Sequence, residues 1–128
     1  MAEPPRHRPV RVAVATDDDA LDVQRFGHAT RFVVYEVAGG EARVVETRDT
    51  MPACGSAPGR HEERLDRAVA VVGDCQAMIA REVGPGAAAA LHRRGLHVHL
   101  ASGAVAKALD FLFARNRAPA ARRPGGPA

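Results

Sequence analysis

The sequence predicts an α/β domain in which three short helices pack against a mixed sheet of five strands. Residues 76–91 combine an apolar run, a Gly-Pro-Gly turn and an alanine-rich helix, and Leu96–Leu100 is again typical of a strand. A strand, helix and strand in one sheet imply a right-handed parallel crossover. Further upstream, Gly39-Gly40 separates two strand-like runs and predicts an antiparallel hairpin. The 128 residues, 46% of them hydrophobic, suffice for one compact core.

The strands are predicted from short apolar or β-branched runs bounded by turn residues. The first ends at three consecutive aspartates, the second and third flank the Gly-Gly turn, and a loop with two prolines and two glycines follows over residues 50–60. The expected strands are Val10–Thr16, Phe32–Val37, Ala42–Thr47, Ala77–Ala80 and Leu96–Leu100.

The helices are predicted from apolar stripes of helical period. The first, His61–Gly73, has two glutamates in its positive first turn and apolar residues spaced three and four apart. The second runs from Pro85 to Arg94 and stops at Gly95, and the third spans Ala104–Ala114 after the N-cap Ser102.

This element order brings distant residues to one edge of the sheet. If the second strand opposes the other four, the loops at residues 17–30, 49–60, 81–86 and 101–103 share one edge, where α/β proteins usually bind ligands. That edge should collect His28, Cys54 and His61. Cys75, between the first helix and the fourth strand, should lie at the opposite edge, so the two thiols should not meet.

Charge is distributed unevenly along the chain. The whole chain carries 18 Lys/Arg and 15 Asp/Glu, a net charge of +3, but residues 10–114 hold 12 basic and 14 acidic residues. The basic excess therefore lies in two tails rich in Pro, Ala and Arg, residues 1–9 and 115–128, which we expect to be disordered around a single domain at 10–114. One Tyr, four Phe and no Trp argue against a surface for nucleic acid.

No apolar run approaches 18 residues, and the N-terminus has no apolar segment typical of a secretory signal. We therefore expect a cytoplasmic protein with no membrane contact. Two cysteines do not form a disulfide framework, and in a reducing compartment they are free thiols or ligands.

The main candidate site is the set His28, Cys54 and His61. A soft thiolate with imidazoles suits an iron–sulfur species or another soft metal. Backbone N–H groups at Gly84 and Gly86, where the second helix begins, add an anion site, and Ser102 and Gly103 follow the fifth strand at the same edge.

Three other chemistries are compatible with the residues. The cluster Asp17, Asp18, Asp19 and Asp22 would suit a metal-dependent hydrolase, but it lacks carboxylate partners from distant elements, and a polar loop with an Asx turn is the favoured interpretation. Cys54 and His61 would suit a nucleophile and its base, but no residue supplies the orienting third group. His97 and His99, on one face of a strand, would suit a divalent ion or a half-exposed strand.

Several segments together resemble a known family. Their order along the chain is similar to that of the dinitrogenase iron–molybdenum cofactor biosynthesis family, whose members include NifX-like carriers and the tail domain of NifB. The segments are Val12-Ala-Val-Ala-Thr-Asp-Asp, Phe26-Gly27, Phe32-Val-Val-Tyr-Glu-Val, Asp74-Cys75-Gln, Gly84-Pro85-Gly86-Ala and Gly95-Leu-His-Val. The segment Met51-Pro-Ala-Cys54, followed by His61-Glu-Glu-Arg-Leu65, resembles the nitrogenase-type members in particular.

The resemblance implies a ribonuclease-H-like fold with three layers, α/β/α, and strand order 3-2-1-4-5. It also implies a role without turnover, because family members of known role bind iron–sulfur or iron–molybdenum cofactor precursors and pass them on. By position, Cys54 and His61 are candidate cluster ligands. Where the family commonly has His-Phe-Gly-Arg this chain has Arg25-Phe26-Gly27-His28, so His28 would be a displaced substitute. Arg81, where many members have a small residue, could contact an anionic cluster.

The resulting hypothesis is a small, non-enzymatic carrier of an iron–sulfur-type cofactor precursor. Its partners would be the assembly proteins that donate and accept the cluster, and it would be a monomer or a weak dimer. The alternatives are a protein interaction module of the same fold that binds no metal, and a metal-dependent hydrolase.

Overall fold

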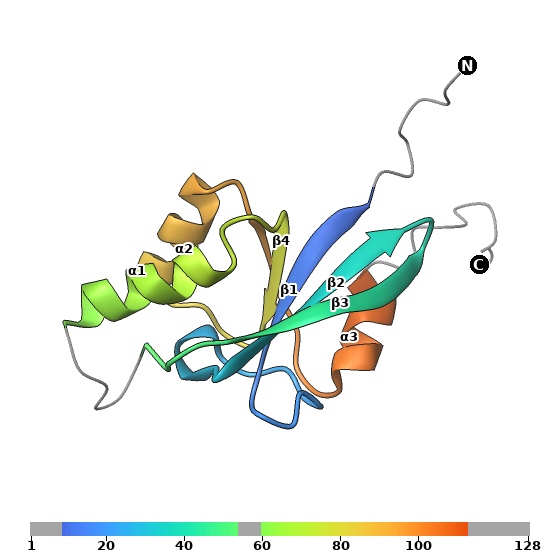
Figure 1. Cartoon of the computed structure of the whole chain (residues 1–128), viewed down its shortest axis with the longest axis horizontal. Coiled ribbons are helices and arrows are strands. Elements are labelled where there is room, and N and C mark those ends of the chain that lie inside the picture. The colour runs from blue at the N-terminus through green and yellow to red at the C-terminus, as the bar shows by residue number, and fades with distance from the viewer. Residues whose placement is uncertain (1–8, 54–59, 113–128) are drawn as a thin grey trace, which may run out of the picture.

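The computed structural model describes residues 9–53 and 60–112. Within them lie five strands, three α-helices and one short 3-10 helix (Figure 1). In chain order they are β1 Val10–Thr16, η1 Phe26–His28, β2 Arg31–Ala38, β3 Glu41–Asp49, α1 His61–Val71, β4 Ala77–Ala80, α2 Pro85–Arg93, β5 His97–Leu100 and α3 Val105–Leu112.

The predicted fold class and strand order are confirmed. The sheet has the order β3-β2-β1-β4-β5. Strand β2 is antiparallel to both of its neighbours, whereas β1, β4 and β5 pair in parallel. The carboxyl ends of β1, β3, β4 and β5 therefore meet at one edge of the sheet, as the sequence predicted.

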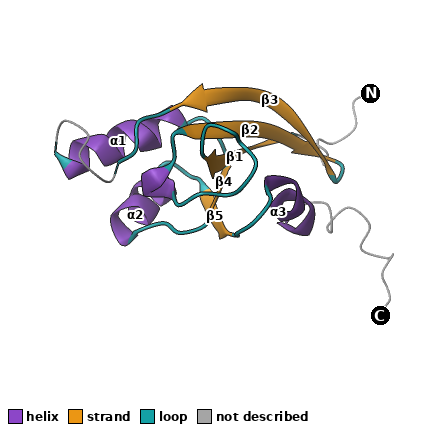
Figure 2. Cartoon of the chain, turned by 90° about the horizontal axis from the view of Figure 1, so that it is seen from below, coloured by secondary structure: helices purple, strands orange, loops and turns teal. Residues whose placement is uncertain are grey.

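Three layers arise because alternate residues of each strand face opposite sides of the sheet. Residues such as Phe32, Val34 and Met78 pack with α1 and α2 in one core cluster. Their neighbours, such as Val12 and Ile79, pack with α3 in a second cluster. Figure 2 shows α1 and α2 side by side on one side of the molecule and α3 apart from them.

The predicted bounds of β1 and β4 match the structure, and the others differ by one or two residues. The β2–β3 hairpin extends further at both ends than predicted, because pairing continues from Arg31 with Asp49 to Ala38 with Glu41. Gly39 and Gly40 have φ of 63° and 83°, which confirms the predicted primed turn. The last two residues of the predicted third helix lie outside the described part of the chain. Among the described residues, no helix is long and apolar enough to cross a membrane.

Candidate functional site

The loop after β1 is fixed by backbone hydrogen bonds to the loop after β4. The Phe26 N–H donates to the Glu82 carbonyl at 2.9 Å, and the Arg81 N–H donates to the Gln24 carbonyl at 3.0 Å. This loop ends in η1, which places His28 at the carboxyl edge of the sheet. Phe26 is buried and packs against Phe32, with ring centroids 5.6 Å apart.

The first residues of α2 lie near η1, at the same edge of the sheet. Gly84 is the N-cap and Pro85 the first helical residue, as predicted, and the Ala88 N–H already donates to the Gly84 carbonyl at 2.8 Å. The N–H groups of Gly86 and Ala87 belong to the first turn, so they have no acceptor within the helix. A Cβ at Gly86 would lie 3.5 Å from Leu65 of α1, so the two helices approach closely here.

The start of α1 completes the arrangement. The Glu63 carboxylate accepts the Arg60 N–H at 3.2 Å, as in a capping box, and His61 is the first helical residue. His61 is exposed. Both α1 and α2 therefore present their positive N-terminal ends near His61.

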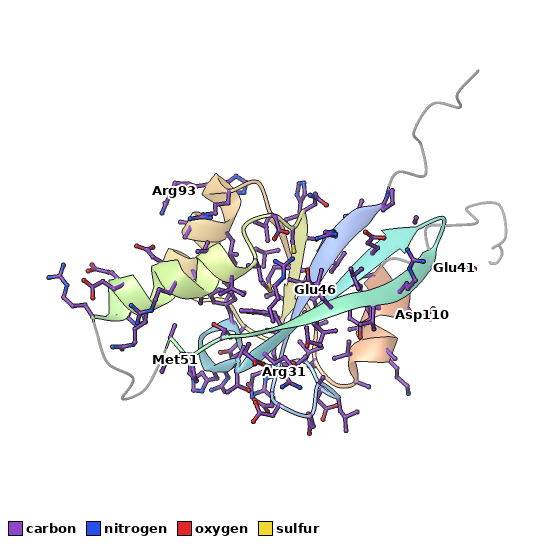
Figure 3. All side chains as sticks on the ribbon, viewed as in Figure 1. Arg31, Glu41, Glu46, Met51, Arg93 and Asp110 are labelled. Atoms are coloured by element: carbon purple, nitrogen blue, oxygen red, sulfur yellow. The ribbon has the colours of Figure 1, made fainter. Side chains whose placement is uncertain are left out.

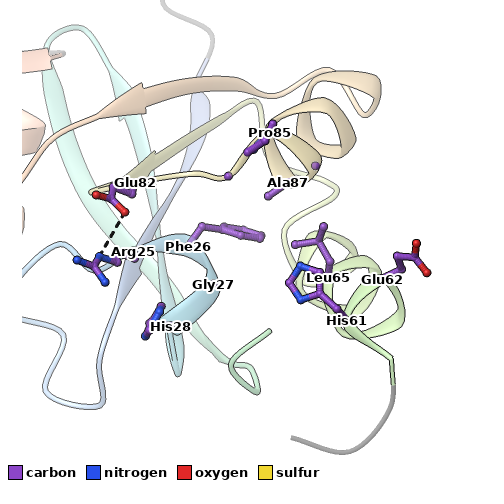
Figure 4. A pocket seen from close by; sticks show the side chains of 12 residues that line it. Arg25, Phe26, Gly27, His28, His61, Glu62, Leu65, Glu82, Pro85 and Ala87 are labelled. Carbon is purple, nitrogen blue, oxygen red and sulfur yellow. Dashed lines mark ion pairs between the residues drawn. The ribbon is translucent and has the colours of Figure 1, made fainter. Parts of the chain in front are cut away.

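These three elements enclose a pocket of about 540 Å3 (Figure 4). It is lined by Arg25, Phe26, Gly27, His28, His61, Glu62, Leu65, Glu82, Gly84, Pro85, Gly86 and Ala87. Four residues predicted from the sequence, His28, His61, Gly84 and Gly86, thus lie around one space although up to 58 positions separate them.

The pocket combines an apolar interior with charged walls. In Figure 4 the Phe26 ring points toward Leu65 and His61, while His28 lies on the η1 side. Arg25 Nε lies 3.4 Å from Glu82 Oε1, so this carboxylate is partly neutralised, and both side chains are exposed. Glu62 adds a second carboxylate on the α1 side.

The other predicted anion-site residues lie elsewhere on the same edge. The Arg81 guanidinium contacts the Gln24 amide oxygen at 3.4 Å and does not line the pocket. Ser102 and Gly103 precede α3, which covers the other face of the sheet, and the Gly103 carbonyl accepts the Val23 N–H at 2.8 Å. Sharing an edge therefore does not bring these residues into the pocket.

Cys54 lies outside the described residues, so the structure does not place the predicted thiolate. The structure describes the chain up to Ala53 and again from Arg60. The Ala53 carbonyl accepts a hydrogen bond from Arg64 Nε at 2.9 Å. Across residues 9–53 and 60–112, no three His, Cys, Asp or Glu side chains converge as they would around a metal ion.

The aspartate cluster after β1 forms local structure. Asp19 accepts the Leu21 N–H at 3.1 Å, which is the predicted Asx turn, and Asp18 accepts the Thr30 hydroxyl at 2.6 Å. Both Asp17 oxygens accept the Gln24 amide at 3.0 Å. These bonds support the structural interpretation of the cluster over the hydrolase.

The second cysteine lies at the opposite edge, in a different environment. Cys75 is buried, and burial together with the neighbouring Asp74 carboxylate raises its pKa to about 11. Beside it Arg48 donates to Asp74 at 2.6 and 3.0 Å and to the Val71 carbonyl at 2.8 Å. The Arg48 hydrogen bonds lower the pKa of Asp74. These groups support the fold, and a neutral buried thiol is a poor metal ligand.

The pair His97 and His99 lies on edge strand β5, paired with Ala77 and Ile79, and therefore on the α3 face. Burial, and then the proximity of His97, lowers the pKa of His99. This pair is remote in the fold from the pocket between α1, α2 and η1.

The sequence did not identify the pocket's walls. Leu65 and Phe26 were assigned to a helix stripe and a family motif, and Arg25, Glu62 and Glu82 were not predicted as lining residues. The available signal was the pair of oppositely charged residues Arg25 and Glu82, which lie in two loops predicted to share the same edge.

Comparison with known proteins gives a consistent result. The sequence profile of the family described as "Dinitrogenase iron-molybdenum cofactor" matches residues 8–115. The FeMo cofactor biosynthesis protein NifB of Frankia alni is 37% identical over 125 residues, which cover 93% of this chain and 24% of that protein. Protein NifX of Rhodobacter capsulatus is 37% identical over 97 residues, which cover 73% of this chain and 60% of NifX. The chain thus spans about a quarter of NifB and about three fifths of NifX.

The fold also matches a solved structure. The crystal structure of PH0822 superposes with a TM-score of 0.64, covering 80% of this chain and 89% of that one, at 18% sequence identity. At that identity the comparison supports the fold alone.

Proposed function

Because the chain belongs to the dinitrogenase iron–molybdenum cofactor family, we propose that it is a non-enzymatic carrier of an iron–sulfur-type cofactor precursor, bound in the pocket between η1, α1 and α2. The observation that supports this most directly is that His28, His61 and the start of α2 all line one pocket of about 540 Å3. The name of the relative NifB, a FeMo cofactor biosynthesis protein, supports iron–molybdenum cofactor assembly as the setting.

Several parts of the pocket suit such a cargo. Iron–sulfur clusters are anionic and bind soft or imidazole donors, and His28 and His61 provide two imidazoles. The N–H groups of Gly86 and Ala87 can donate hydrogen bonds to an anion, and the N-terminal ends of α1 and α2 add positive electrostatic potential. Phe26 and Leu65 exclude water from one side of the cargo.

Cys54 is the proposed thiolate ligand. It lies in the segment that joins Ala53 to Arg60, directly before His61 and the start of α1. Ligands from several segments of the chain, each contributing part of the affinity, suit a protein that must release its cargo to an acceptor. The donor and the acceptor would be proteins of cofactor assembly.

The test is anaerobic reconstitution of the full chain with ferrous iron and sulfide, followed by gel filtration and iron and sulfide analysis. We expect the wild-type chain to retain a cluster with visible charge-transfer absorption, and Cys54→Ala to lose most of it at unchanged melting temperature. Cys75→Ala is the matched control and should retain the cluster. A wild-type chain that retains no iron would contradict the carrier function and favour the protein interaction module.

A further inference from the structure

Strand β3 forms an open edge of the sheet. Among the described strands it pairs only with β2, and eight of its nine residues are exposed. Two of them are large and apolar, since Val44 is 54% and Val45 is 39% exposed. An edge strand presents unpaired backbone N–H and C=O groups that can pair with another strand.

The two faces of β3 differ in chemistry. Residues paired directly across an antiparallel ladder point to the same face. Glu46 pairs with Val34 and Arg43 with Glu36, so both lie on the face that α1 and α2 cover, whereas Val44 pairs with Tyr35 on the α3 face. A bulge at Val45, where the register shifts, allows Arg43 and Glu46 to share a face although three positions separate them.

The order of charged and apolar residues along β3 is complementary to that of a second β3 strand running in the opposite direction. We propose that β3 pairs antiparallel with β3 of a second copy of the chain, with the twofold axis between Val44 and Val45. In this register each copy contributes the same cross-strand pairs. They are Arg43 with Glu46, Glu41 with Arg48, and Ala42 with Thr47.

The register is specified by charge. Arg43 and Glu46 would face each other on the α1/α2 face twice, once on each side of the axis, and Figure 3 shows Glu41 and Glu46 well separated along β3. If one β3 strand were shifted along the other by two residues in one direction, Glu41 of each copy would lie opposite Glu46 of the other. A shift by two residues in the other direction would place Arg43 opposite Arg48. Like charges directly opposite are destabilising, so both shifts are disfavoured.

The side chains have room for these contacts. The side chain of Arg43 is 79% exposed and that of Glu46 is 44% exposed. Arg43 already lies 3.1 Å from Glu36, and Glu46 lies 2.6 Å from Arg48, so the cross-copy pairs would extend an existing network. On the other face Val44 of each copy would lie beside the axis, where the second copy would cover it.

A single edge pairing forms a small interface, so the dimer should be weak. Interfaces below about 1,200 Å2 are typical of transient complexes. We therefore expect reversible association, weakened by salt because oppositely charged exposed pairs contribute to it. The dimer does not depend on bound cargo and is tested on the cluster-free protein.

The experiment is sedimentation velocity on the full, cluster-free chain from about 10 µM to about 1 mM, the range in which small interfaces dissociate. We expect the wild type to shift from monomer to dimer. Arg43→Glu and Glu46→Arg should each raise the dissociation constant at least about tenfold, because like charges then oppose each other. Arg93→Glu, at the far end of α2 (Figure 3), makes the same charge change as Arg43→Glu away from β3 and should leave the dimer unchanged.

The decisive experiment is to mix the two charge variants. A chain with Arg43→Glu and a chain with Glu46→Arg oppose complementary charges in the proposed register, so an equimolar mixture should dimerise although neither variant does alone. If Glu46→Arg fails to fold because it loses Arg48, Val44→Lys, on the other face, replaces it and should also abolish association. A wild-type chain that stays monomeric at about 1 mM would overturn the proposal. So would a mixture that stays monomeric, or an equal loss in Arg93→Glu.

Discussion

At the carboxyl edge of the sheet, His28 and His61 are exposed beside a pocket, whereas Arg48 of β3 is joined to Asp74 and Cys75, which precede β4, in a network whose polar groups have partners. The Arg48 side chain is only 18% exposed and serves three acceptors from three segments. The pocket residues come from equally distant segments, but His28 and His61 are not needed to fill the core.

This contrast separates stability from binding. A polar group that is buried must be paired, because leaving it unpaired costs free energy. Groups of the Arg48 network should therefore affect unfolding and leave binding unchanged. His28 and His61, by contrast, are solvated and should affect binding while leaving unfolding nearly unchanged.

The largest expected effect on stability is at Arg48. Arg48→Met removes the hydrogen bonds to Val71 and Asp74 and should lower the free energy of unfolding by about 2 kcal/mol. Urea denaturation measures this loss. Arg93→Met, an exposed arginine at the end of α2, is the control and should change stability by less than about 0.5 kcal/mol. Equal effects of the two changes would show that the Arg48 hydrogen bonds do not stabilise the fold.

A smaller loss is expected at Cys75. Cys75→Ala should cost about 1 kcal/mol because a small buried side chain is removed. Since burial raises the pKa of this thiol to about 11, native protein at neutral pH should alkylate at Cys75 far more slowly than unfolded protein. Peptide mass spectrometry after iodoacetamide labelling measures both rates. Rapid labelling of native Cys75 would contradict its burial.

A still smaller effect is expected on the acid side of the pH profile. Arg48 lowers the pKa of Asp74 below its ordinary value of 3.8, so the folded state favours the carboxylate. The corresponding stabilisation is present above that value and is lost as pH falls through the lowered pKa. Urea denaturation between neutral pH and acid should show a shallower acid limb for Asp74→Asn than for the wild type. An unchanged slope would show that Asp74 does not contribute.

The smallest expected effect is at the termini. If residues 10–114 form the domain, deletion of residues 1–9 and 115–128 should shift the melting temperature by less than about 2 °C. Differential scanning calorimetry of the full and trimmed chains measures this. A large loss of stability would show that a terminal segment packs on the domain.

Much of the fold followed from local patterns. The bounds of β1 and β4 were predictable because each apolar run is bounded by polar or turn residues. The hairpin was predictable from Gly39-Gly40, because two successive residues at positive φ favour glycine. By contrast, η1 was missed because a single 3-10 turn has little sequence signal, and it is held by the distant Glu82 carbonyl.

The sequence predicted the edge of the sheet at which the site lies, but not which residues of that edge line the pocket. Topology placed His28, His61, Gly84 and Gly86 together, since they follow strands that end on the same side. It could not separate them from Ser102 and Gly103, because which face a helix covers depends on packing across the sheet. The pairing of Arg25 with Glu82 depends on side-chain geometry that no local pattern encodes.

If the pocket holds the cargo, the double change His28→Ala and His61→Ala is the most direct test. Both side chains are exposed, so the melting temperature should stay within about 3 °C of wild type. Anaerobic titration with ferrous iron and sulfide should show at least a tenfold loss of affinity, about 1.4 kcal/mol. His92→Ala, an exposed histidine at the end of α2, is the control and should bind as the wild type does. Full cluster binding by the double variant, or an equal loss in His92→Ala, would contradict the carrier site.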